Sequence, residues 1–362
     1  MTSTLAMSPT ESAAPAASRL VALDAARGLA VLGMIVVHVG VTRELSWGDP
    51  GGWLSIANGR SSILFATLAG ISIALMSGRE RPPAGQQLVA VRLRILVRAF
   101  VLFVIGGLLT ALGTDVSVIL QTYALLFACC LPFLTWTPRR LLLLAAGWAV
   151  VAPVLTVWLA QVIPGGCDWN AETCSGAQIT DLAVLGDYPG VVWMTFALTG
   201  LAVGRSDLGS TAVRVRMLAA GVPLMLLGYG GARLASSFGD VTASDWAQLR
   251  TAEPHSGTTF EIAGSLGFGL TLLAVLLLIA DRLRPLMFPI AAVGSMPLTV
   301  YAAHIVAIRI LGDSVPESEG DTLLAVFLVL TVAAATIWVS TFGRGPLERL
   351  VTGISTRAVR SR

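Results

Sequence analysis

The residues best placed to do chemistry lie in one short stretch, LDAARGLAVLGMIVVH, at positions 23–38. Asp24 and Arg27 are three residues apart, a spacing at which two side chains can pair on one helix face. Arg27 and His38 are eleven residues apart, about three helical turns, so both would point the same way about 16 Å apart along the axis. Since imidazole titrates near neutral pH, His38 could take a proton from a hydroxyl group. The spacing predicts either a polar track with a cation at one end and a base at the other, or a structural ion pair beside a histidine that bonds a carbonyl.

The other two histidines of the chain lie far along the sequence. His255 occurs in EPHSGT and His304 in GSMPLTVYAAHIV, where Pro297, Tyr301 and His304 share a helix face at spacings of four and three. Pro297 is expected to kink this helix and to free carbonyl groups for polar contacts. Three histidines could also ligate a metal, but no two of them have the short spacing of a ligand pair, so we expect no metal site.

Two further charged residues stand at the starts of apolar segments. Arg60 precedes SSILFATLAGISIAL, and it either extends to the membrane interface or binds a polar or anionic ligand that enters from outside. Glu261 falls in the first turn of a later segment, where the helix dipole favours a carboxylate. A charge inside the hydrocarbon costs several kcal/mol unless it is paired or hydrated, so each such residue is a candidate site.

The elements that carry these residues must lie in lipid. Of the 362 residues 55% are hydrophobic and only 12% are charged, and the mean hydropathy is +0.79. A soluble domain has about 25% charged residues, because its surface must face water. The sequence therefore indicates an integral membrane protein, for which spans of about 20 apolar residues are the test.

Ten segments meet that test and predict an all-α, polytopic transmembrane helical bundle. They are residues 20–41, 58–77, 95–113, 116–136, 141–163, 188–204, 217–235, 258–280, 286–311 and 320–341. In lipid every backbone group must be satisfied within its own helix, which favours one bundle without a separate soluble domain. We expect a disordered cytoplasmic tail at 1–18, a transmembrane domain at 19–350 and a basic cytoplasmic tail at 351–362.

The distribution of arginine sets the expected orientation. All 24 basic residues are arginine, and in the ten-span arrangement five of them are outside, which leaves 24 − 5 = 19 inside. The outer five are Arg43, Arg60, Arg233, Arg250 and Arg309. This bias is typical of cytoplasmic segments and predicts both termini inside. Nucleic-acid binding is not expected, because the arginines alternate with helix ends and form no single stripe.

The four cysteines form two pairs with different expectations. Cys129 and Cys130 fall within a span and are read as small apolar residues. Cys167 and Cys174 fall in the largest outer loop, where the compartment permits a disulfide, and we predict a bond between them.

No nucleotide-binding loop, serine-hydrolase elbow or zinc-protease helix occurs in the sequence. Primary ATP-driven transport by this chain alone is therefore excluded. Three classes stay open: an enzyme, a secondary transporter or flippase that uses Asp24, Arg27 and the outer histidines as a polar pathway, and a structural membrane partner without catalysis.

Several stretches together resemble the transmembrane acyltransferases. The opening helix, with an arginine, ten residues and then a histidine, is similar to acyltransferase family 3. The whole chain is more similar to the YeiB-like group with the domain of unknown function 418, related to heparan-α-glucosaminide N-acetyltransferase. The stretches that carry this resemblance are GRSSILFATLAGISIAL, DYPGVVWMTFALTGLAVGR, AEPHSGTTFEIAGSLGFGL, GSMPLTVYAAHIV and FGRGPLERL, over about residues 19–350.

The resemblance implies transfer of an acyl group, usually acetyl, from cytoplasmic acyl-CoA to an acceptor outside. His38 matches the family-3 histidine that acts as base, and Arg27 matches its paired arginine. The heparan enzyme has Asn at the His38 position, and its catalytic histidine falls where this chain has Asp49. Its mechanism therefore does not transfer directly, and a shared scaffold does not prove shared chemistry.

We accordingly expect a bacterial inner- or plasma-membrane acyltransferase with His38 as the general base. The acyl-CoA co-substrate, with no permanent cofactor, would be held by Arg27, Asp24, Arg92, Arg94 and Arg98. The residues expected to orient the acceptor or the oxyanion are Arg60, His255, Tyr301 and His304. The expected acceptor is an envelope glycan or glycolipid, membrane lipid surrounds the chain, and a homo-oligomer is left open.

Overall fold

The structure, a computed structural model, describes residues 14–40, 48, 50–162, 180–280, 282–312 and 320–360. The predicted Cys167–Cys174 disulfide, Asp49 and the first part of the N-terminal tail lie outside these residues.

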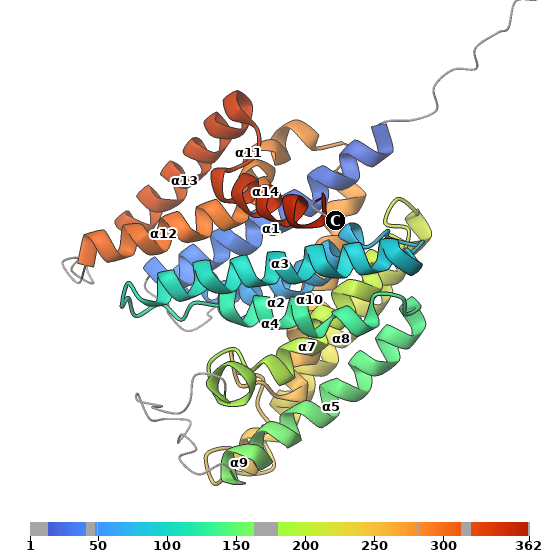
Figure 1. The fold of residues 1–362 in the computed structure, drawn as a ribbon. Coiled ribbons are helices and arrows are strands. Elements are labelled where there is room, and N and C mark those ends of the chain that lie inside the picture. Colours follow the sequence, from blue (N-terminus) through green and yellow to red (C-terminus); the bar gives the residue numbers. More distant parts are fainter. Residues whose placement is uncertain are drawn as a thin grey trace, which may run out of the picture.

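The described part is helical throughout and contains no strand, which confirms the all-α class (Figure 1). The helices are α1 (Ala14–Val39), α2 (Arg60–Met76), α3 (Gly85–Thr110), α4 (Leu120–Cys129), α5 (Pro138–Val162), α7 (Gly190–Gly204), α8 (Thr211–Ser236), α9 (Asp245–Gln248), α10 (Thr259–Ile279), α11 (Arg284–Ser295), α12 (Pro297–Leu311), α13 (Gly320–Phe342) and α14 (Pro346–Arg360). Short turns of other helix types are η1 (Pro50–Ala57), η2 (Leu131–Phe133) and η3 (Asp181–Leu185). α1 begins inside the predicted N-terminal tail, and α14 covers most of the predicted C-terminal tail.

Six of the described helices are long and apolar enough to cross a membrane, or seven spans when a bent pair is included. The six are α1, α2, α5, α8, α10 and α13, and the bent pair is α11 with α12. α3 carries the predicted donor arginines, and α4 and α7 are shorter apolar helices. The chain is thus a multi-pass helical membrane protein, while the number of ten spans stays a prediction.

The bend between α11 and α12 is 70° and falls directly before Pro297. Proline lacks the N–H that would continue the helix, and its ring clashes with the preceding turn. The predicted kink is therefore confirmed, and it separates the Tyr301 and His304 segment from α11.

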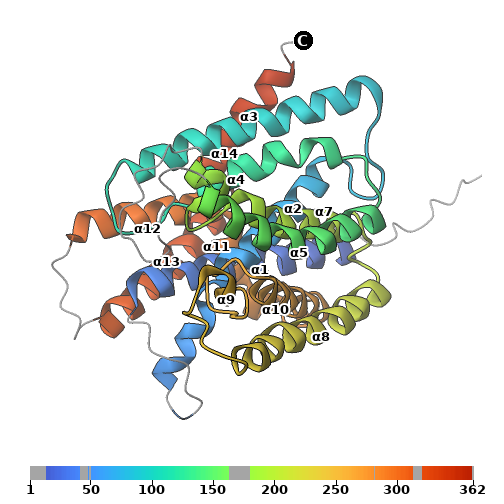
Figure 2. The same ribbon diagram turned by 90° about the horizontal axis from the view of Figure 1, so that it is seen from below.

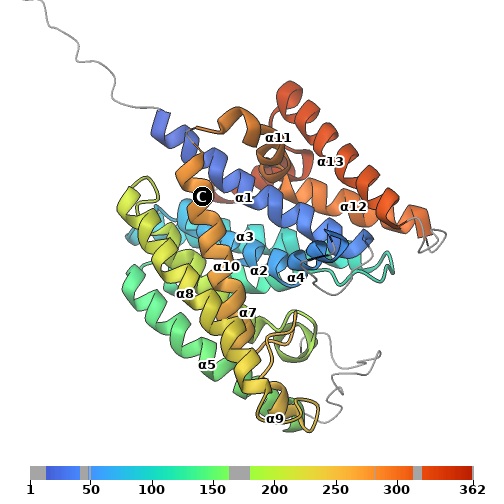
Figure 3. The same ribbon diagram turned by 180° about the vertical axis from the view of Figure 1, so that it is seen from behind.

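α1 runs through the middle of the bundle. Figures 1 and 3 show α11 and α13 on one side of it and α2 and α10 on the other, and α1 contacts all four. Figure 2 shows α3 and α8 at opposite edges of the molecule. The candidate residues of α1 are therefore surrounded by protein, while α13 and α8 present most of their surface outward.

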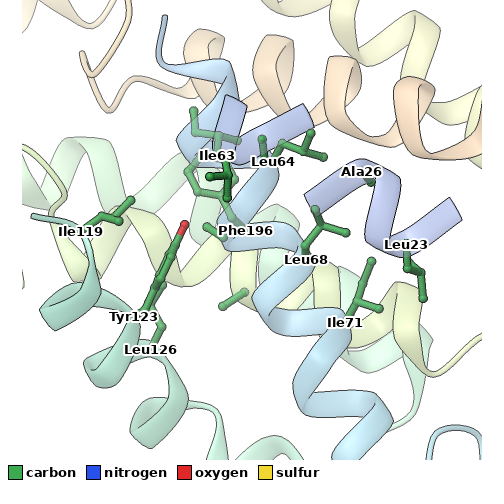
Figure 4. Close-up of a cluster of buried hydrophobic side chains, with 14 of the residues drawn as sticks. Leu23, Ala26, Ile63, Leu64, Leu68, Ile71, Ile119, Tyr123, Leu126 and Phe196 are labelled. Carbon is green, nitrogen blue, oxygen red and sulfur yellow. The ribbon is translucent and has the colours of Figure 1, made fainter. Parts of the chain in front are cut away.

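Close packing of small residues fixes this central position. A Cβ at Gly28 would collide with the Ile290 backbone of α11, and one at Gly294 would collide with the Asp24 backbone of α1. Such contacts are typical of helix pairs in membranes, where small residues let backbones approach. Beyond this seam the core is apolar, with Leu23 of α1 and Phe196 of α7 among the buried side chains (Figure 4).

Candidate functional site

Arg27 of α1 lines a cavity of about 300 Å³, here called the inner cavity, whose charged residues are Arg27, Arg98 and Glu348 and whose polar residues include Ser72. Arg27 donates from Nη1 to Asp24 Oδ1 at 2.6 Å and from Nη2 to Ser72 Oγ at 3.0 Å. The predicted pairing of Asp24 with Arg27 is therefore confirmed. Most of the wall is apolar, formed by residues such as Phe65, Leu68, Leu102, Leu120, Phe127 and Leu298.

The three predicted donor arginines of α3 lie in different surroundings. Arg98 lines the inner cavity together with Arg27. Arg94 donates from Nη2 to the Met76 carbonyl at 2.7 Å and so satisfies the end of α2. Arg92 lines neither of the two cavities described here. The helix brings one of the three cations to the inner cavity, and the roles of all three stay predictions.

Three turns further along α1, His38 lines a second cavity of about 710 Å³. We call it the outer cavity; its titratable and charged residues are His38, Asp115, Asp187, His255 and Arg309. Ser117 donates a hydrogen bond to Asp187, and Arg309 donates from Nε to the Leu112 carbonyl at 2.9 Å. Both cavities therefore contain charged groups, but only the outer one contains imidazoles.

His38 forms a pair with His304 of α12. His38 Nδ1 lies 3.0 Å from His304 Nε2, and the two rings are stacked with centroids 5.3 Å apart. His304 is 3% exposed, and the Tyr301 ring packs against it edge-on at 5.0 Å. Because one nitrogen of each ring faces the other, one imidazole must donate and the other accept.

α12 passes both cavities in turn. Leu298 and Tyr301 line the inner cavity, and Ile308 and Arg309 line the outer one. His304 lies between these two groups on the same helix. The bend before Pro297 sets the direction of α12, and this one helix lines both cavities.

Tyr301 lies where α12 runs from the inner cavity toward the outer one. The Ile119 amide, at the start of α4, donates to Tyr301 Oη at 3.3 Å. Arg27 therefore lines one cavity and His38 another, with Tyr301 and His304 between them. The sequence alone predicts one continuous track on α1, whereas the structure divides it.

His255 comes from the loop before α10 and lines the outer cavity with His38. Its backbone has φ of +63°, a left-handed conformation that non-glycine residues rarely adopt. Tyr188 packs against its ring edge-on at 5.4 Å. Burial lowers the pKa of His255 below 6.5, and the nearby Asp187 carboxylate opposes this shift without cancelling it.

Arg60 lies at the start of α2 but does not line the outer cavity. Its Nε donates to Tyr229 Oη at 2.7 Å, and its guanidinium lies over the Tyr229 ring, 4.6 Å from the centroid. The structure thus directs Arg60 toward α8, and its expected contact with an acceptor stays a prediction.

Sequence reasoning did not single out several residues that the structure brings to the cavities. Ser72 and Glu348 line the inner cavity, and Asp115 and Asp187 line the outer one. Glu348 lies in FGRGPLERL, one of the stretches that carry the family resemblance, so the sequence offered a reason to single it out. Nothing in the spacing of Ser72 sets it apart from other helix serines. In the described residues no group of three or more side chains suited to a metal ion occurs.

Two known protein families match parts of this chain. Residues 19–232, more than half of the chain, match the catalytic domain of heparan-α-glucosaminide N-acetyltransferase. Residues 209–356 match a family of unknown function, DUF418. No curated protein matches the chain significantly. The match indicates an acetyltransferase-like function in the membrane, and it confirms the resemblance found in the sequence. The chain therefore belongs to the family of the heparan-α-glucosaminide N-acetyltransferase catalytic domain.

Proposed function

We propose that this protein transfers an acyl group, usually acetyl, from cytoplasmic acyl-CoA to a hydroxyl or amine of an envelope glycan or glycolipid outside. One observation carries the proposal: α1 places Arg27 in the inner cavity and His38 in the outer one, and α12 lines both cavities, with His304 of that helix in contact with His38. A donor and an acceptor could thus approach one point from opposite sides.

The inner cavity suits the acyl donor. Arg27 and Arg98 offer two cations for phosphate oxygens, with which guanidinium forms charge-assisted hydrogen bonds. Asp24 and Ser72 hold the Arg27 side chain in place. The apolar walls beyond the arginines suit the thioester-bearing arm of acyl-CoA. Arg92 and Arg94, on the same helix as Arg98, would add positive potential along α3.

His38 would act as the general base in the outer cavity. When His38 Nδ1–H donates to His304 Nε2, His38 Nε2 is left as the proton acceptor. The acceptor oxygen or nitrogen attacks the thioester carbonyl while His38 Nε2 takes its proton. The C–S bond then breaks, and the leaving thiolate takes that proton to become the thiol of CoA, so that His38 is neutral again. His304 keeps the His38 tautomer, and His255 faces the acceptor.

Tyr301 must move during this reaction. Its ring lines the inner cavity, packs against His304 and accepts a hydrogen bond from the Ile119 amide, so a donor arm that extends toward His38 would displace it. The expected acyl transfer therefore requires a step in which this contact breaks.

The purified protein in liposomes provides the test. Acetyl-CoA labelled in the acetyl group is supplied on one side and an extract of envelope glycans and glycolipids on the other, and we expect label in the extract. Label that stays in acetyl-CoA, together with net movement of an unmodified solute, would support a transporter instead, because two cavities with a closed barrier also suit alternating access.

A further inference from the structure

The proposed reaction leaves one deeply buried carboxylate without a role. Glu261, in the first turn of α10, is 3% exposed. Its Oε1 accepts the His255 amide at 2.6 Å and its Oε2 accepts the Gly257 amide at 2.7 Å, with Ser256 Oγ more distant at 3.4 Å. A buried carboxylate is costly unless hydrogen bonds satisfy it. Here every one of these donors belongs to the single loop that carries His255.

The backbone of this loop is held in an uncommon shape. His255 and Gly257 both have positive φ, +63° and +65°. Glycine adopts this conformation freely, whereas for histidine it costs free energy that other interactions must offset. Successive amides in such a turn converge on one anion, and Glu261 supplies that anion from within the chain. The hydrogen bonds from the His255 and Gly257 amides to Glu261 therefore account for the uncommon backbone conformation of His255.

The same carboxylate is fixed to the helix behind it. Thr258 caps α10 by accepting the Glu261 amide at 3.0 Å, and its hydroxyl donates to the Thr251 carbonyl at 2.5 Å. A capping threonine three residues before a glutamate is the usual start of a helix. In the usual form, however, the glutamate bonds the cap residue itself, whereas Glu261 reaches past it to the His255 loop.

The ring of His255 has little else to orient it. It packs edge-on against Tyr188, and its Nδ1 is buried with no hydrogen-bond partner among the described residues. The imidazole lines the outer cavity with His38. Its position there is accordingly set by the backbone that Glu261 holds.

We propose that Glu261 is a positioning residue, whose carboxylate holds the His255–Gly257 loop so that the His255 imidazole faces an acceptor in the outer cavity opposite His38. The consequence for acyl transfer rests on the proposed function, while the effect on the His255 ring does not.

Because the chain has only three histidines, NMR of the histidine side chains tests the first part directly. We compare full-length protein in detergent, labelled with ¹⁵N-histidine, as wild type, Glu261→Gln and Glu253→Gln. Glu253 provides the matched control, since it lies in the same segment with an exposed side chain. The His255→Asn variant assigns the signal, because asparagine tolerates positive φ. We expect the His255 signal to shift in Glu261→Gln and to stay in Glu253→Gln.

The His38 and His304 signals in the same spectra report whether the fold is intact. An unchanged His255 signal in Glu261→Gln would overturn the inference. Equal disturbance of all three signals would also overturn it, because Glu261 would then support the whole fold and not one loop.

Acetyl transfer from labelled acetyl-CoA to envelope extract tests the second part. We expect kcat/KM for the acceptor to fall about 10- to 100-fold in Glu261→Gln, the size typical of a displaced reacting group, while KM for acetyl-CoA stays unchanged. The double variant Glu261→Gln with His255→Asn should be no slower than His255→Asn alone, because Glu261 acts only through His255. Additive losses would overturn the inference. Absence of transfer by the wild type would instead reject the proposed function, and the NMR comparison would still decide the role of Glu261.

Discussion

The inner and outer cavities use the same two helices for different chemistry. α1 contributes Arg27 to one and His38 to the other, and α12 lines both. The inner cavity combines the guanidinium groups of Arg27 and Arg98 with an apolar wall. The outer cavity is larger and holds imidazoles and carboxylates, which can exchange protons. The difference fits the proposed function, in which one side would bind a charged ligand and the other would move protons.

The barrier between the cavities explains how one helix can serve both purposes. Tyr301 and His304 lie one helical turn apart, so the same face of α12 closes the inner cavity and supports His38. A continuous water-filled track would let protons and ions follow the polar residues of α1. In the proposed function, ligand binding and proton transfer would stay apart until a ligand displaces Tyr301.

We expect the largest effect from removing the proposed general base in the outer cavity. His38→Ala should lower acetyl transfer about 10²- to 10⁴-fold, the usual contribution of a general base. Binding of acetyl-CoA, measured by calorimetry, should not change, because His38 does not line the inner cavity. Full transfer by a His38→Ala protein with a normal melting temperature would contradict the division of roles.

A change in the inner cavity should have the opposite profile. Arg27→Gln should raise the Kd for acetyl-CoA about 10- to 100-fold, since a charge-assisted hydrogen bond contributes about 1.5–3 kcal/mol. The acceptor KM should stay constant. The double variant with Asp24→Asn serves as the control, because it removes the carboxylate that Arg27→Gln would leave unpaired. If the acceptor KM rises instead of the Kd for acetyl-CoA, the inner cavity binds the acceptor and not the acyl donor.

The joint between α14 and α12 should matter less and affect stability first. Glu348 accepts the Leu298 and Thr299 amides at 2.7 and 3.1 Å and the Thr299 hydroxyl at 2.6 Å, at the N-terminus of α12. Glu348→Gln should therefore lower the free energy of unfolding by about 1–2 kcal/mol, because a charged acceptor is lost from a helix N-terminus. Thermal unfolding in detergent measures this, with Thr299→Ser as a control that keeps the hydroxyl. An unchanged Tm would show that α14 is not fixed through Glu348.

The smallest effect concerns the pH dependence of stability. Burial keeps the pKa of His255 below 6.5, so as pH falls below 6.5 the unfolded chain takes up a proton that the folded chain refuses. His255 therefore lowers the free energy of unfolding at low pH, by up to about 1 kcal/mol at pH 5.5. Well above pH 6.5 it has no such effect. His255→Asn should lose less Tm than the wild type between pH 7.5 and 5.5. An equal loss of Tm in both proteins would mean that the His255 imidazole is solvated in the folded state and not buried.

Much of the site could be predicted because it follows from one helix. The Asp24–Arg27 pair and the common direction of Arg27 and His38 depend only on helical spacing, and the kink before Pro297 depends only on the missing N–H. The structure has the ion pair and the kink. Contacts between helices could not be predicted in this way. His38 and His304 are 266 residues apart in sequence, and no periodic pattern says that they meet.

The same limit explains the residues whose surroundings differ from expectation. Arg60 points to Tyr229 because α8 lies against α10 at that depth, which depends on packing. Of the α3 arginines only Arg98 lines the inner cavity, while Arg94, one turn earlier, donates to the Met76 carbonyl at the end of α2. Glu261 fits a helix cap from its sequence position, and the left-handed backbone of His255 decides that it also holds a loop.

The sequence by itself determined that this chain is a bundle of apolar helices and that its first helix carries a cation and an imidazole on one face. Composition and local spacing suffice for both, since lipid requires helices and helix geometry fixes the directions of side chains. Only the tertiary structure decided that α1 lines two cavities, that Tyr301 lines the inner one and that His304 pairs with His38. Those features depend on how closely helices approach, which contacts such as Gly28 against Ile290 settle in three dimensions.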